Sequence, residues 1–180
     1  MGKFPEFSII SNDPRMSKSK IRPVKEVINF KPRGLWYSRD DEWFRWSEEE
    51  MFYEPEELEK LYLYSIKFVD NAFIDSKNVC YSCLEERNLN THKILVISSM
   101  REYREFYHYF KAGNGLIDWR QVQKYFSGFQ VDFDPNKYKL QEKDQNMMIT
   151  IAVYDVRSGS IWDPRVIDRI ENLGLLVDYS

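Results

Sequence analysis

Apolar and polar residues alternate along several short stretches of the chain, which is the period of a β-strand with one buried face. The clearest case is residues 61–69, where aromatic and branched side chains occupy every second position. Other apolar runs have the length of a strand and are bounded by turn-forming residues. We therefore expect strands at 21–27, 35–38, 61–69, 93–98, 128–133 and 147–156, and a short last one at 175–177.

Elsewhere apolar residues recur three or four positions apart, the spacing of a helix with one buried face. Two capping boxes begin at Ser99 and at Asp118. In a capping box, a polar residue and an acid or amide three positions later cap the same helix start. Asp163 stands just before a proline, the composition of a further helix start. We expect helices over about 41–51, from 55, and over 99–113, 118–126 and 163–173.

The predicted order of elements indicates the fold class. Strands and helices come in mixed order, without the regular β-α-β alternation of a parallel sheet and without an internal repeat. Residues 1–20 are polar and contain two prolines, so we expect a flexible, loosely held N-terminal arm there. The rest, 21–180, should form a single α+β domain with a mixed, largely antiparallel sheet and four or five helices, and residues 70–92 should be a polar excursion from its core.

The amino-acid composition and the net charge exclude several classes of protein. The 180 residues are 43% hydrophobic and 31% charged, as in an ordinary folded domain. The formal charge of −3 argues against a protein that binds nucleic acid mainly through its net positive charge. No apolar run approaches the roughly 20 residues of a membrane helix, and no signal peptide opens the chain, so we expect a cytoplasmic protein without a membrane partner.

The two cysteines, Cys80 and Cys83, form a C-x-x-C pair. This pair could be half of a zinc site, with His92 or His108 as further ligands, or a redox pair. A second cysteine pair and the helix start of a thioredoxin-type motif are both missing from the sequence. We therefore expect two structural thiols and no metal.

Three motifs stand out and are rich in tryptophan. They run from Lys31 to Ser38 (KPRGLWYS, followed by two tryptophans), from Ile117 to Phe133, and from Tyr154 to Asp163. Together they resemble a family of small proteins of large DNA viruses, phages, bacteria and fungi. The resemblance spans roughly four-fifths of the chain. Its middle motif departs at Phe133-Asp134, where the family has a Pro-Tyr pair.

A weaker resemblance is to the ADP-ribosyltransferase fold. There, an early strand carries an Arg or His, a second strand reads Gly-Leu-Tyr-x-Thr/Ser, and a late strand supplies Glu, Asp or Gln. The resemblance implies a site for NAD or a similar nucleotide. It implies cofactor-binding roles for Arg22, Gly34, Trp36 and Ser38, and catalytic roles for Gln130 and Asp132.

The chemistry of such a site is intelligible. An aromatic ring stacks on nicotinamide, an arginine holds phosphate or ribose, and a carboxylate stabilises the oxocarbenium-like sugar. A glutamine at the last position could bind a ribose hydroxyl but could not act as a base. Structural roles compete with each assignment, because tryptophans are most often core anchors, Ser38 is placed to cap a helix, and Arg22 suits the surface.

Two functions follow. The first is a protein that binds NAD or transfers ADP-ribose, in a virus or phage to modify a host component. The alternative is a non-enzymatic module that binds a host protein, for which an aromatic-rich surface is typical. The first predicts that Arg22, Trp36, Ser38 and Gln130 line one cleft, and the alternative predicts that a host protein is captured in stoichiometric amount.

Overall fold

The computed structural model describes residues 3–22, 28–29, 31–87, 91–138 and 145–179. It has an eight-stranded sheet in the order β10-β4-β1-β3-β9-β8-β6-β5 and a two-stranded sheet of β2 and β7. All neighbours in the large sheet are antiparallel except β8, β6 and β5, which run parallel to one another. The predicted class, α+β with a largely antiparallel sheet, is confirmed.

The strands occupy short segments. Their bounds are β1 Phe7–Ser11, β2 Ile28–Asn29, β3 Leu35–Arg39, β4 Tyr62–Phe68, β5 Phe73–Asp75, β6 Ile94–Ile97, β7 Ile117–Asp118, β8 Gly128–Val131, β9 Ser158–Ile161 and β10 Ile167–Leu175. The helices are α1 Glu42–Glu49, α2 Pro55–Leu58, α3 Leu84–Arg87, α4 Met100–Phe110, α5 Trp119–Tyr125 and α6 Gln145–Ala152. Single 3₁₀ turns lie at Lys18–Lys20, Ser76–Asn78, Tyr81–Cys83, Pro135–Tyr138, Pro164–Val166 and Leu176–Asp178.

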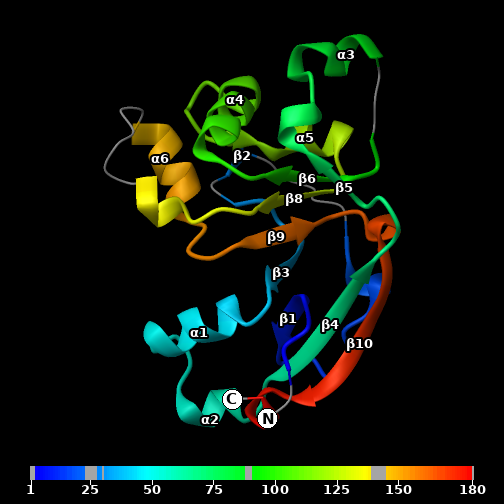
Figure 1. The fold of residues 1–180 in the computed structure, drawn as a ribbon, viewed down its shortest axis with the longest axis vertical. Coiled ribbons are helices and arrows are strands. Elements are labelled where there is room, and N and C mark those ends of the chain that lie inside the picture. The colour runs from blue at the N-terminus through cyan, green and yellow to red at the C-terminus, as the bar shows by residue number, and fades with distance from the viewer. Residues whose placement is uncertain (1–2, 23–27, 30, 88–90, 139–144, 180) are drawn as a thin grey trace.

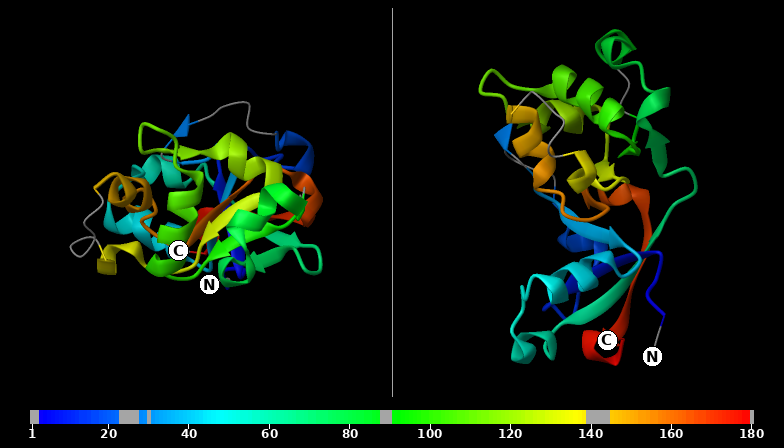
Figure 2. Two further views of the ribbon diagram at one scale, coloured as in Figure 1. Left: turned by 90° about the horizontal axis from the view of Figure 1, so that it is seen from above. Right: turned by 60° about the vertical axis from the view of Figure 1, so that its left-hand side comes forward.

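The elements divide between two ends of the sheet (Figure 1). At one end α4, α5 and α6 cover β6 and β8, and the largest core cluster lies there, with Phe106, Trp119 and Phe129 almost inaccessible to solvent. At the other end α1 and α2 pack near β1, β4 and β10, and both chain termini lie there (Figures 1 and 2).

The sheet curls, which brings its two ends together. Phe68 at the end of β4 and Phe73 on the edge strand β5 have ring centroids only 4.8 Å apart. These rings, with Phe7 and Tyr37, form a second cluster on the concave side of the sheet. The curl therefore creates an inner face that is separate from the helix-covered core.

Local patterns specify several elements correctly. Ser99 caps α4 by accepting from the Glu102 amide, and Asp118 caps α5 by accepting from the Arg120 amide. The predicted strands at 35–38, 61–69, 93–98 and 128–133 correspond to β3, β4, β6 and β8. The predicted helices at 41–51, 55, 99–113 and 118–126 correspond to α1, α2, α4 and α5.

The N-terminal arm is corrected. Phe7–Ser11 form β1, which pairs with β3 on one side and β4 on the other, in the interior of the sheet. The predicted excursion at 70–92 likewise contains the edge strand β5. In the predicted strand 21–27, Ile21 and Arg22 are not in a strand and residues 23–27 lie outside the described residues.

Two element types near the C-terminus were predicted wrongly. The expected strand at 147–156 is instead α6, because Met147, Thr150 and Ile151 bury one helical face in the main core. The expected helix at 163–173 is a 3₁₀ turn followed by β10, and the expected strand at 175–177 lies at the end of β10 and in the next turn. The register of β10 against β4 shifts twice, after Ile167 and after Asn172. Such irregularities break the two-residue period and produce the helix-like spacing of apolar residues.

Candidate functional site

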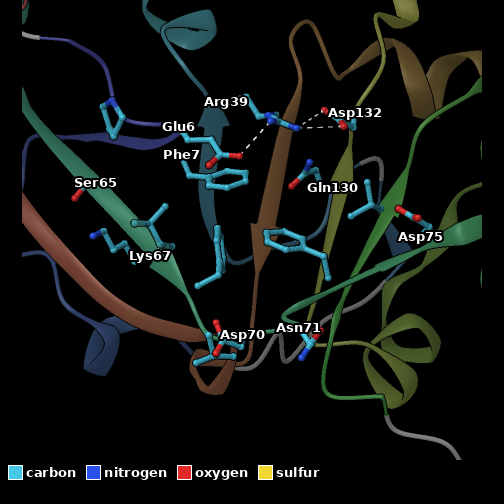
Figure 3. Close-up of a pocket in the computed structure, with 16 residues that line it drawn as sticks. Glu6, Phe7, Arg39, Ser65, Lys67, Asp70, Asn71, Asp75, Gln130 and Asp132 are labelled. Atoms are coloured by element: carbon cyan, nitrogen blue, oxygen red, sulfur yellow. Dashed lines mark hydrogen bonds and ion pairs between the residues drawn. The ribbon is translucent and has the colours of Figure 1, made fainter.

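A cavity of about 700 Å³ opens on the concave side of the curled sheet (Figure 3). Gln130 and Asp132, the two residues assigned catalytic roles from the sequence, both line it. Residues from β4 and β5, at or near opposite ends of the strand order, also contribute to its walls, which is a consequence of the curl. Further lining residues used below are Glu6, Phe7, Arg39, Phe68, Asn71, Phe73 and Asp75.

Gln130 is held by a row of residues that crosses three strands. Tyr37 on β3 lies opposite Gly159 on β9, which lies opposite Gln130 on β8. The Tyr37 hydroxyl reaches over Gly159 and donates to Oε1 of Gln130 at 2.7 Å. Burial raises the pKa of Tyr37 well above its usual value, and the nearby Asp132 carboxylate adds to this while Arg39 opposes it, so the hydroxyl stays protonated as a donor.

That hydrogen bond orients the Gln130 amide. Because Oε1 accepts from Tyr37, the amide nitrogen is turned away from Tyr37 and toward the neighbourhood of Asp132 (Figure 3). Gln130 itself is only 2% exposed. Its amide NH₂ is thus a fixed donor in the wall of the cavity.

Arg39 and Asp132 form the polar upper edge of the cavity (Figure 3). One terminal nitrogen of Arg39 lies 3.3 Å from both Asp132 carboxylate oxygens, and the other lies 3.3 Å from Glu6. The guanidinium carbon is 5.4 Å from the centroid of the Phe7 ring. Within the described part of the chain, the buried Nε of Arg39 has no hydrogen-bond partner.

The lining can hold a ligand by hydrogen bonds, ion pairs and aromatic contact. Gln130 has no titratable group, and Asp132 is engaged by Arg39. Among the described residues that line the cavity there is no histidine or cysteine, and the other ionisable groups are Glu6, Asp70, Asp75 and Lys67.

Trp36 and Ser38 face the other side of the sheet, because alternate residues of β3 point in opposite directions. Both line a smaller cavity of about 100 Å³, together with Ser8 of β1, Ser158 of β9 and Trp43 of α1. The Ser8 hydroxyl donates to the carbonyl oxygen of Asp40 at 3.0 Å, so at 3.2 Å it accepts from Ser38. We call this cavity the Trp36 pocket.

The Trp36 ring also has a packing role. Its centroid lies 5.7 Å from that of Tyr154, and the Lys31 ammonium lies 5.1 Å from the Trp36 centroid. Burial lowers the pKa of Lys31, and the nearby carboxylate of Asp155 partly opposes this. The first residue of the KPRGLWYS motif therefore covers the motif's tryptophan.

Gly34 and Arg22 line neither of these two cavities. A Cβ at Gly34 would lie 2.5 Å from the carbonyl oxygen of Ile161 and from the Ser160 hydroxyl, so this glycine permits close packing of β3 on β9. Arg22 is exposed and donates to the carbonyl oxygens of Ser19 and Ile21.

The sequence-predicted site is thus divided. Gln130 and Asp132 lie in the concave cavity, Trp36 and Ser38 lie in the Trp36 pocket on the opposite face, and the expectation of one shared cleft is wrong. Sequence reasoning missed Arg39 and Glu6. Arg39 could have been found from strand alternation, because it lies two residues beyond Tyr37, whereas Glu6 belongs to the segment set aside as an arm.

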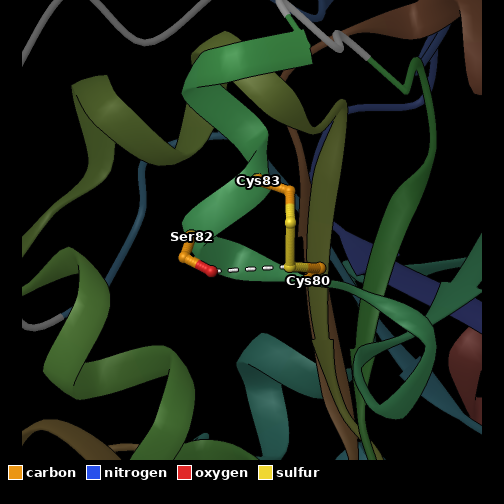
Figure 4. Close-up of a disulfide and its surroundings, with 3 residues drawn as sticks. All are labelled: Cys80, Ser82 and Cys83. Carbon is orange, nitrogen blue, oxygen red and sulfur yellow. Dashed lines mark hydrogen bonds between the residues drawn. A yellow bond between two sulfur atoms is a disulfide. The ribbon is translucent and has the colours of Figure 1, made fainter.

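The cysteine expectation is also corrected. Cys80 and Cys83 form a disulfide, with the Ser82 hydroxyl 3.4 Å from the Cys80 sulfur (Figure 4). Reduced thiols would have supported the expectation of a cytoplasmic location, and a disulfide does not support it. In the described ranges, no group of three or more His, Cys, Asp or Glu side chains is placed to hold a metal ion.

Comparison with known proteins identifies no relative. No family model matches the sequence, and no curated protein or solved structure is significantly similar to the chain. Of the helices in the described part of the chain, none has the length and apolar character needed to cross a bilayer.

Proposed function

We propose that this protein binds NAD or a related nucleotide, and that the nicotinamide-type ring enters the Trp36 pocket. One observation carries the proposal: two of the four residues assigned to the cofactor from sequence, Trp36 and Ser38, line one cavity with a second tryptophan, Trp43. Indole rings stack on flat heteroaromatic rings. The serine hydroxyls of the pocket can both donate to and accept from a carboxamide.

The size of the pocket limits what it holds. A volume of about 100 Å³ is of the order of a few water molecules or part of a single ring. A nicotinamide-type ring would therefore enter only in part, and the ribose, pyrophosphate and adenosine would lie on the surface.

Binding is proposed without transfer of ADP-ribose. Transfer requires a group that stabilises positive charge on the sugar beside the ring. Among the described residues of the Trp36 pocket none carries a carboxylate, and Gln130 and Asp132 lie across the sheet.

A ligand titration followed by thermal unfolding tests the proposal. A Kd near 0.1 mM would stabilise the protein by about 1.4 kcal/mol at 1 mM NAD. For a domain of this size that is a rise in Tm of about 3–5 °C. Nicotinamide mononucleotide should also stabilise the protein, and ADP-ribose, which lacks the ring, should not. Equal effects of NAD and ADP-ribose would contradict the assignment of the ring.

Variants locate the site. Trp43→Leu removes one stacking surface and should abolish the NAD response, whereas Ser82→Ala, beside the disulfide, should retain it. Intrinsic tryptophan fluorescence supplies a second readout. No change in Tm or fluorescence at 10 mM NAD would refute the proposal.

A second function is favoured by an exposed aromatic surface at the end of α1. Met51 is 85% exposed and Phe52 is 54% exposed, and the Phe52 ring lies 5.3 Å from that of Trp46. Residues 40–60 carry ten carboxylates and only two cationic side chains. Exposed apolar residues with a polar rim are typical of protein-binding surfaces. A basic segment of a partner, in the infected cell if the protein is viral, would suit this acidic surface.

Affinity capture separates the two functions. The wild-type protein should retain a stoichiometric partner at physiological salt, and Phe52→Ser should lose it while keeping its response to NAD. Val177→Ser changes a similarly exposed apolar residue elsewhere and serves as the control. Retention of the same proteins by Phe52→Ser would remove this surface from consideration.

A further inference from the structure

The concave cavity has the position and size of a ligand site in its own right. Its volume of about 700 Å³ lies within the range of small-molecule pockets. It lies where the parallel strands end: Asp75 is the last residue of β5, and Asp132 directly follows β8. In open parallel α/β sheets the carboxyl ends of the strands are the usual location of ligand sites, and β5, β6 and β8 are the parallel strands of this sheet.

Aromatic rings line the cavity. Phe7, Phe68 and Phe73 are only half-buried and pack against one another, with centroids 4.8 to 5.6 Å apart. All three also line the cavity. They offer flat apolar surface to a ligand, as rings do in sites that combine apolar contact with a few fixed polar groups.

The polar wall combines donors and acceptors. Gln130 presents a fixed NH₂ donor, Asn71 adds a second amide, and carboxylates come from Glu6, Asp75 and Asp132. Hydroxyl groups both donate and accept hydrogen bonds, so such a mixture can satisfy several of them at once.

The charges of the lining exclude an anionic ligand. Four carboxylates and two cationic side chains line the described part of the cavity, and Arg39 is already bound by Asp132 and Glu6, so an anion would meet net repulsion. The same excess of carboxylates attracts a cation, so charge alone does not select a neutral ligand. The half-buried phenylalanine rings and the donating amide of Gln130 favour a neutral ligand, and the cationic comparison in the experiment below separates the two.

From this combination we infer that the concave cavity binds a neutral polyhydroxylated ring, either a free hexose or the ribose of a nucleoside. The ring's C–H face packs on the phenylalanines, and its hydroxyls bond to the carboxylates and to the Gln130 amide. This site is separate from the Trp36 pocket, because the two open on opposite faces of the sheet.

Saturation-transfer difference NMR on the full chain tests the inference. The probes are glucose, galactose and mannose in one arm and adenosine and uridine in the other, each at 10 mM, with spermidine as a cationic comparison. Transfer to the sugar-ring protons of at least one probe is expected. Transfer confined to hexoses identifies a free sugar as the source, and transfer confined to nucleosides identifies ribose.

Variants tie the signal to the cavity. Phe73→Leu and Asp75→Ala should each weaken binding of that probe at least tenfold, and Asp168→Asn, an exposed carboxylate on β10, should leave it unchanged. Asp75 is itself partly exposed, so its variant keeps the measurement informative if Phe73→Leu does not fold.

Three results would overturn the inference. They are no transfer to any hexose or nucleoside, transfer to spermidine alone, and transfer that survives undiminished in a folded Phe73→Leu or Asp75→Ala protein. Trp43→Leu should keep this signal while losing the effect of NAD, so failure of one site is distinguishable from failure of the other.

Discussion

At the scale of single residues, Gly159 explains how the concave face is built. The ring of Tyr37 lies directly over it, and a Cβ at this position would lie 2.5 Å from the Tyr37 Cζ and hydroxyl oxygen. Because Gly159 has no side chain, the Tyr37 hydroxyl can reach the Gln130 amide. Among the described residues, this is the only hydrogen bond from β3 that fixes that amide. Gly159 of the third motif therefore has a packing role in this row.

Gly159→Ala should therefore destabilise the protein by about 2–4 kcal/mol, from overpacking plus the loss of a buried hydrogen bond. Urea unfolding measures the effect. Gly113→Ala is the matched control, because an added Cβ there meets nothing within 4 Å, and it should be neutral or slightly stabilising. In a Tyr37→Ala background Gly159→Ala should cost much less, since the clashing ring is gone. An equal cost in both backgrounds would contradict this explanation.

Asp163 gives a pH-dependent prediction. Partial burial tends to raise its pKa, but hydrogen bonds from Arg165 and Ser127 outweigh burial and hold the pKa below its usual value of 3.8. The folded state therefore favours the charged form. Its contribution to stability is complete above the unfolded pKa and is lost as the pH falls through the lower folded pKa.

Asp163→Asn keeps a capping side-chain oxygen but loses the charge that Arg165 binds, so it should cost up to about 1 kcal/mol at pH 7, the upper end for a partly exposed ion pair. The difference from wild type should narrow below pH 3.8 and vanish in stronger acid. Chemical unfolding at pH 7, 4 and 2.5 checks this, with Asp168→Asn as an exposed control. A deficit that stays constant across this range would show that the charge of Asp163 is not responsible.

At the scale of elements, β1 has the largest consequence. Its residues pair on both sides, and Ile9 is only 3% exposed. Local composition suggested an arm because prolines flank the strand and its five residues, FSIIS, do not alternate strictly between apolar and polar positions. Pairing with two distant strands, which local pattern does not record, makes it an interior strand.

Deletion of residues 1–11 should therefore abolish cooperative unfolding and near-ultraviolet circular dichroism, because it leaves unpaired strand edges inside the sheet. Deletion of residues 1–3 should shift Tm by no more than about 2 °C, as expected for a change at a chain end. Cooperative unfolding of the longer deletion near the wild-type Tm would show that β1 is dispensable.

Helix α6 and strand β10 show why element type was predictable in some segments only. Capped helices such as α4 and α5 combine a cap with a helical apolar period, and both signals agree. A short apolar run such as 147–153 fits a strand or a buried helix equally well, and packing against the core decides. In β10 the irregular register displaces its apolar residues from the strand period.

At the scale of the whole molecule, the sheet is covered unevenly. All residues of β6, β8 and β9 are buried, whereas β10 at the sheet edge is exposed or only partly buried at every position after Ile167, with no regular alternation. Local opening is rarest where both faces of a strand are covered.

Amide hydrogens of Ile94–Ile97 and Gly128–Val131 should accordingly exchange most slowly, at rates set by global unfolding. Amides of β10 that point away from β4 should exchange faster by at least two orders of magnitude, which corresponds to a difference of roughly 3 kcal/mol in opening free energy. NMR-detected hydrogen exchange gives both sets in one experiment. Equal rates in β6 and at the free edge of β10 would mean that the sheet opens as one unit.

The pattern of residues along the chain was enough to predict the α+β class, the strands β3, β4, β6 and β8, and the capped helices α4 and α5. It also placed Trp36 on the same side of its strand as Ser38, and Gln130 on the same side as Asp132. Each of these follows from the local period of two or 3.6 residues. Which of these residues lie on the same face of the sheet depends on the register between strands, and that register is set by the tertiary structure. In the register through β9, Trp36 aligns with Ser160 and Phe129, and Tyr37 aligns with Gly159 and Gln130. A slip of one residue would have placed Trp36 beside Gln130, and no local pattern specifies the register of strands about 90 residues apart.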